Sequence, residues 1–125
     1  IPQRLVYNID ETAVKIVPAA GWTMEQKGTS TVAVTGVDDK RQVTATIAVT
    51  AAGEKLPIHL IYEGSTARCE PPQQYRPQGW LFSHSSNHWS NRDLFVTFVK
   101  EVVIPHRDAY IKEAKLPQVC PLSFF

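Results

Sequence analysis

The chain has 125 residues, of which 43% are hydrophobic and 20% are charged, and its formal net charge at pH 7 is +1. A chain of this length forms at most one ordinary domain, and this apolar fraction is typical of a globular core and excludes wholesale disorder. The net charge is too small to favour or to exclude nucleic acid as a partner.

The first predicted element is a strand over residues 4–10, which is apolar on both of its faces and ends with adjacent carboxylates at Asp10 and Glu11. Because side chains alternate along a strand, these two acids point to opposite faces. Burying an unpaired charge is costly. Asp10 therefore needs either a salt bridge, to Lys15, Arg41 or a neighbour, or a metal ion, and the pattern alone leaves both interpretations open.

A loop is predicted at residues 18–30, a short β-branched strand at 31–35 and a turn at 36–41, where Asp38 and Asp39 are expected to be solvated. The clearest periodic signal comes next.

In residues 42–51, apolar side chains alternate with threonine and alanine, which predicts a half-buried antiparallel strand. Residues 56–62 predict the next strand. Since Pro57 cannot donate a ladder hydrogen bond, that strand should lie at an edge or begin at its proline.

Residues 63–90 predict a long irregular loop, and loops of this length are usually functional. His84 and His88 have the spacing of a metal pair on a helix, but their polar surroundings favour a loop and no third zinc ligand is evident. Other side chains of this loop suit either stacking on nucleic-acid bases or pinning the loop to the sheet. They are Tyr75, Trp80, Trp89, Arg68 and Arg76.

A helix is predicted over residues 91–115, opened by the capping pattern S-x-x-D at 90–93 and kinked or interrupted at Pro105. Residues 119–125 predict a final strand. The fold class is therefore α/β: an antiparallel meander, a long helix, and a strand that the helical connection can place parallel to the first.

The two cysteines lie far apart and lack the spacing of a zinc site or the density of a secreted disulfide scaffold. No apolar run reaches the roughly 18 residues of a membrane span, and no signal-peptide pattern is present, so we expect no membrane partner.

Four motifs occur together at specific spacings: N-x-D-E-T, W-T-x-x-x-K-G, D-D-K-R-x-x-T and L-P-x-x-L-I-Y-x-G. With them, over nearly the whole chain, the sequence closely resembles DDE-superfamily endonucleases, the transposases of the pogo, Tigger and Jerky type. The resemblance implies a ribonuclease H-like fold in which three acids bind two Mg²⁺ ions, with Mn²⁺ as a possible substitute. It makes Asp10 the first catalytic and metal-binding acid, near the C-terminal end of a central strand.

The resemblance also implies hydrolysis of DNA at transposon ends, strand transfer into target DNA, and a location in the nucleus. Residues 1–125 would be the N-terminal part of the catalytic domain, an incomplete ribonuclease H-like fold that stops before the second acid. Alone it should be inactive, and its apolar first strand should promote self-association. The alternative is a domesticated relative that binds DNA or protein without catalysis.

Overall fold

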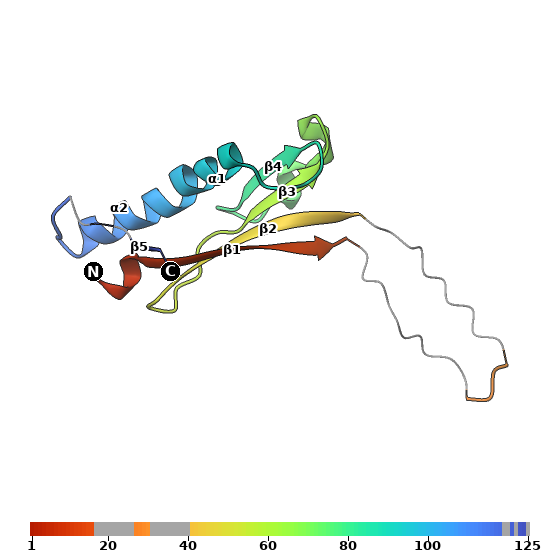
Figure 1. Cartoon of the computed structure of the whole chain (residues 1–125), viewed down its shortest axis with the longest axis horizontal. Helices are drawn as coiled ribbons and strands as arrows, with labels where there is room; N and C mark the ends of the chain where they lie inside the picture. Colours follow the sequence, from red (N-terminus) through yellow and green to blue (C-terminus); the bar gives the residue numbers. More distant parts are fainter. Residues whose placement is uncertain (17–26, 31–40, 119–120, 122, 125) are drawn as a thin grey trace.

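The computed structural model describes residues 1–16, 27–30, 41–118, 121 and 123–124. These residues form a mixed five-stranded sheet in the order β4-β3-β2-β1-β5, and the helices lie along one face of it (Figure 1). The protein is therefore of the α/β class, as predicted. The strands are β1 (Val6–Lys15), β2 (Gln42–Thr50), β3 (His59–Glu63), β4 (Leu81–Ser85) and β5 (Ser123–Phe124).

Strands β1 and β2 form a long antiparallel pair that begins with Tyr7 opposite Thr50 and ends with Lys15 opposite Gln42. Strand β3 pairs antiparallel with β2. The predicted meander is confirmed for these three strands. The strand predicted at 31–35 lies outside the described residues, as do most of the loop at 18–30 and of the turn at 36–41.

The prediction of an irregular segment at 63–90 is wrong in one part, because this segment contains β4, which pairs parallel with β3. The strand is short and three of its five residues are polar, so its periodic signal is weak. Its parallel pairing also depends on a distant crossover rather than on a local turn. With β4 on its outer side, β3 is an interior strand, and it starts two residues after Pro57.

The predicted long helix is present as α1 (Arg92–Phe98), the π-helical turn η4 (Val99–Val103) and α2 (Ile104–Glu113). Its cap is Asn91, whose Oδ1 accepts a hydrogen bond from the Leu94 N–H at 2.9 Å, so the predicted cap at Ser90 is one residue early. The helix continues through Pro105. The N–H of Ile104 donates to the carbonyl of Val99, five residues back, so a wider turn falls where the proline would disturb α-helical bonding.

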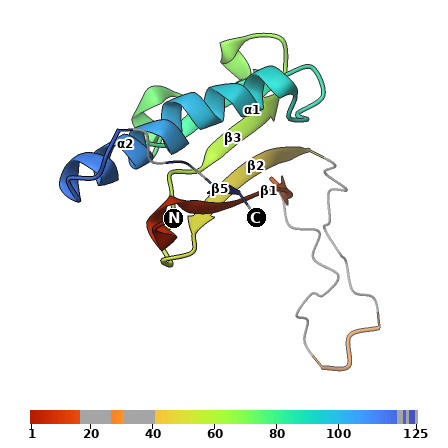
Figure 2. The same ribbon diagram turned by 60° about the vertical axis from the view of Figure 1, so that its left-hand side comes forward.

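The hydrophobic core lies between this helix and the sheet, and Figure 2 shows the helix crossing the strands. Phe98 and Val103 are fully buried against Tyr7 of β1 and Ala48 of β2. The ring of Phe98 also stacks on His59 of β3, with 6.0 Å between ring centroids. The helix therefore holds the three central strands through one apolar stripe.

A polar network joins the first strand to the second half of the helix. The hydroxyl of Tyr7 hydrogen-bonds Nδ1 of His106 at 2.8 Å, and Nε2 of His106 lies 3.3 Å from Glu54. Arg4 forms ion pairs with Glu54 at 2.5 Å and with Glu113 at 3.4 Å. Burial, followed by the nearby Glu54 carboxylate, raises the pKa of Tyr7 to about 12, so its hydroxyl stays protonated at neutral pH.

The final strand lies where the sequence predicts it. Ser123 and Phe124 of β5 pair with Val6 and Tyr7 in parallel orientation. Beyond Tyr7, β1 is paired only with β2 among the described residues. None of the helices in this described part of the chain has the length and apolar character needed to cross a membrane.

Candidate functional site

Asp10 lies in the middle of β1 and not near its end, which corrects the predicted position. The strand continues to Lys15 because β2 supplies pairing partners as far as Gln42. Asp10 sits opposite Ile47 and its side chain is exposed. Its Oδ1 accepts a hydrogen bond from the N–H of Glu11 at 2.9 Å.

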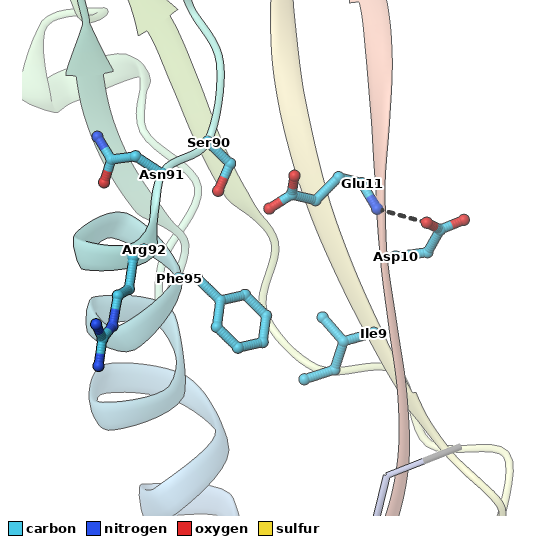
Figure 3. Close-up of a pocket in the computed structure, with 7 residues that line it drawn as sticks. All are labelled: Ile9, Asp10, Glu11, Ser90, Asn91, Arg92 and Phe95. Carbon is cyan, nitrogen blue, oxygen red and sulfur yellow. Dashed lines mark hydrogen bonds between the residues drawn. The ribbon is translucent and has the colours of Figure 1, made fainter.

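The carboxylates of Asp10 and Glu11 lie on opposite faces of the sheet, as their alternation predicts. Tyr7, two residues before Ile9 and four before Glu11, is buried beneath the helix, so these three residues define the helix face of β1. Figure 3 shows Glu11 directed toward Ser90 and Asp10 directed away from the helix. Lys15 lies four residues after Glu11 and therefore on the same face of β1, opposite to Asp10. The strand geometry thus disfavours the salt bridge between Asp10 and Lys15 that the sequence left open.

An open cleft of about 470 Å³ separates β1 from the start of α1. Glu11 and Ile9 approach it from the strand, and Ser90 and Phe95 approach it from the other wall (Figure 3). The Phe95 ring is 41% exposed, although the helical pattern predicts it within the apolar stripe. Asn91 and Arg92 complete the wall on the helix side, and the backbone of β1 at Asp10 forms part of the opposite wall.

A smaller hollow of about 180 Å³ adjoins this cleft, and Glu11 and Ser90 line both. The hollow lies over the far ends of β1 and β2, beside the loop that follows β4. It is lined by Glu11, Thr12, Ala13, Gln42, Thr44, His88, Trp89 and Ser90. The sequence pattern assigns no site role to Glu11, Gln42 or Thr44. Their shared helix-side face follows only once the β1–β2 register is known.

His84 and His88 do not form a pair, because each has its own partners. Nδ1 of His84 lies 2.7 Å from the Glu70 carboxylate, which also binds Arg76 at 3.0 Å. His88 instead hydrogen-bonds Gln42 at 3.2 Å and Thr44 at 3.4 Å, on the helix face of β2. The four-residue spacing therefore does not define a metal site.

The aromatic side chains of the long loop also have separate environments. Trp80 is half-buried, whereas Tyr75 is 71% and Trp89 is 65% exposed. Arg76 lies over the ring of Phe82, 5.0 Å from its centroid, which pins this part of the loop to β4. Trp89, one of the predicted stacking residues, lines the smaller hollow.

The residues described here do not make a complete site for two magnesium ions. Each Mg²⁺ takes a near-octahedral set of oxygen ligands, and the resemblance assigns three acids to the pair. Asp10 offers one carboxylate, and Glu11 faces the other way. No group of three or more His, Cys, Asp and Glu side chains is placed to share a metal ion within the described part of the chain.

Comparison with protein-family models, with curated proteins and with solved structures finds no match to this chain.

Proposed function

We propose that this chain is the first part of the catalytic domain of a DDE-type DNA endonuclease and that Asp10 is one of its metal-binding acids. The observation that carries the proposal is the exposed carboxylate of Asp10, within the motif N-x-D-E-T, on a strand with neighbours on both sides in the sheet order. The reaction is metal-dependent hydrolysis of a DNA phosphodiester at a transposon end, followed by strand transfer.

The arrangement of the elements supports a ribonuclease H-like fold as part of this proposal. Three antiparallel strands, β1 to β3, are followed by β4, which pairs parallel with β3, and then by a long helix that returns the chain to β5, parallel to β1. This is the order expected for the first part of such a fold. The helix lies on the face opposite Asp10, and the Asp10 side chain is exposed (Figure 3).

The role proposed for Asp10 is to hold a hard cation with an oxygen ligand. An exposed carboxylate is suited to this because Mg²⁺ and Mn²⁺ prefer oxygen donors. Magnesium, when bound, would polarise the phosphate and activate the attacking water. The proposal requires further acids from outside the described residues. Because β5 runs alongside β1 toward Asp10, we place the second acid on the continuation of β5.

The test is cleavage of supercoiled DNA that carries the element's own ends by the full-length protein. Cleavage that depends on Mg²⁺ or Mn²⁺ and stops with a chelator supports the proposal. Binding of the same DNA without cleavage in either metal would favour a domesticated binding module instead.

A further inference from the structure

The loop after β4 presents an indole at the surface beside the smaller hollow. Trp89 is 65% exposed, and its ring stacks on His88 with centroids 5.8 Å apart and an interplanar angle of 22°. Large exposed aromatic rings are enriched where proteins bind partners, because they offer much contact area with little conformational freedom to lose.

Two hydrogen bonds hold the backbone of the loop at Trp89. The hydroxyl of Ser85 donates to the carbonyl of Trp89 at 2.9 Å, and the Trp89 N–H donates to Asn87 Oδ1 at 3.3 Å. His88 has a φ of +55°, a left-handed conformation that non-glycine residues adopt uncommonly. The loop is thus fixed in a conformation that costs some strain.

Two side chains of β2 hydrogen-bond the His88 imidazole. Its Nε2 accepts from the Gln42 amide at 3.2 Å, which leaves its Nδ1–H to donate to the Thr44 hydroxyl at 3.4 Å. Both ring nitrogens of a neutral imidazole are then satisfied. The stack of His88 and Trp89 therefore rests on the sheet through two side-chain contacts.

The lining of the hollow includes both polar and aromatic residues. Glu11, Gln42 and Ser90 supply a carboxylate, an amide and a hydroxyl, and Trp89 supplies a flat ring. At about 180 Å³, the hollow is smaller than the roughly 300–1,000 Å³ of pockets for drug-sized ligands. It suits one planar ring system with hydrogen-bonding edges.

We propose that this hollow binds one unpaired nucleobase of DNA, which stacks on Trp89 and turns an amino group toward Glu11. The proposal rests on the proposed function, because it assumes that DNA is the substrate. Base–aromatic stacking is a general means of holding single-stranded nucleic acid. A carboxylate accepts from the amino groups of cytosine, adenine or guanine, and thymine has no amino group.

The position of the hollow gives the base a role in handling DNA next to the proposed metal site. Glu11 and Asp10 are adjacent on β1, so the hollow that Glu11 lines adjoins the strand that carries the proposed metal ligand. The base that we assign to the hollow is therefore one that flanks the cleaved bond. A duplex cannot offer such a base without unpairing it.

The test measures binding of the full-length protein to a hairpin duplex with a single-stranded cytosine overhang and to the same hairpin with a blunt end, without divalent metal. We expect Trp89→Ala to weaken overhang binding about tenfold, the effect of losing one stacked base, and to leave blunt-end binding unchanged. Trp89→Phe should restore most of the affinity. Tyr75→Ala, at an exposed ring that does not line the hollow, is the matched control.

A second variant tests the edge contact. Glu11→Gln should reduce the preference for a cytosine overhang over a thymine overhang, because the amide is a weaker acceptor than the carboxylate.

Equal overhang binding by Trp89→Ala and Tyr75→Ala, or an equal loss of blunt-end binding, would overturn this inference even if DNA cleavage is intact. Absence of any overhang binding would overturn it as well. If overhang binding depends on Trp89 but no metal supports cleavage, the inference stands and the proposed endonuclease activity fails.

Discussion

Asp10 and Glu11 are neighbours on β1, yet their carboxylates lie on opposite faces of the sheet (Figure 3). The main-chain N–H of Glu11 donates a hydrogen bond to Oδ1 of Asp10, and this bond restrains the Asp10 carboxylate. Asp10 faces away from the helix and Glu11 faces it. Substitutions at the two positions should therefore have separable effects.

The Tyr7–His106 hydrogen bond should contribute to folding stability. Replacing Tyr7 by phenylalanine removes the hydroxyl and leaves Nδ1 of His106 without this 2.8 Å contact, at a side chain that is fully buried. We expect a loss of about 1 kcal/mol in the free energy of unfolding, measured by urea denaturation. Tyr75→Phe changes an exposed ring and is the control. Equal stability of the two variants would mean that the hydrogen bond contributes nothing.

His59 should make the fold sensitive to acid. Burial lowers its pKa from 6.5 to about 4, against a smaller opposing effect of Glu70. The unfolded chain therefore binds a proton between pH 6.5 and about 4 that the folded chain does not, and stability falls as the pH falls through this range. One pKa unit corresponds to about 1.4 kcal/mol. The free energy of unfolding should therefore fall by about 3 kcal/mol over this pH range.

The variant that checks this assignment is His59→Gln, whose amide can still donate to Ser83, the present partner of His59 at 2.8 Å. Its unfolding free energy should fall less steeply over the same pH range than that of the wild type. Identical pH dependence in the two proteins would show that other groups cause the acid sensitivity.

Asn91 should be the residue that caps the helix. Its side chain accepts from the Leu94 N–H, so Asn91→Ala leaves an unsatisfied donor in the first turn. We expect a destabilisation of about 1 kcal/mol in thermal or chemical unfolding. Ser90→Ala, at the position that the sequence pattern favours, should change stability by less. The reverse order would contradict the cap seen in the structure.

Exposed apolar side chains of the β1–β2 pair should promote self-association. Val14 and Val49 remain 44% and 37% exposed, and both lie on the side of Asp10, since Asn8 faces Val49 and Val14 faces Val43 in the strand register. Sedimentation of the 125-residue chain should show an apparent mass that rises with concentration. Val49→Thr should reduce this rise. A monomer at all concentrations would exclude association through this face.

Strong local patterns predict several elements of this fold correctly. The period-two alternation of residues 42–51 predicts β2, and the helical connection predicts β5 beside β1 in parallel orientation. The prediction of β2 needs only the pattern within that segment, and the prediction of β5 needs only the rule that a helical connection can join parallel strands. The strand β4 has neither, because polar residues occupy three of its five positions and its partner β3 lies beyond a long crossover.

The site is less predictable than the fold for a physical reason. Alternation along β1 separates Asp10 from Glu11, but only the packing of Tyr7 under the helix reveals which acid faces which side. The pairing of β1 with β2 carries the strand past Asp10, and no pattern near Asp10 signals this continuation. Similarly, the contact between His88 and Gln42 joins residues far apart in sequence, so no local motif indicates it.

The central claim, that Asp10 binds the catalytic metal, is tested most directly by the cleavage activity of two single variants of the full-length protein. Asp10→Asn should abolish Mg²⁺- and Mn²⁺-dependent strand cleavage while DNA affinity stays at the wild-type level, because the amide is neutral and binds a hard cation poorly. Glu101→Gln, at an exposed acid of the helix that lines neither the cleft nor the hollow, should retain metal-dependent cleavage. Undiminished cleavage by Asp10→Asn, or an equal loss of cleavage in both variants, would contradict the account.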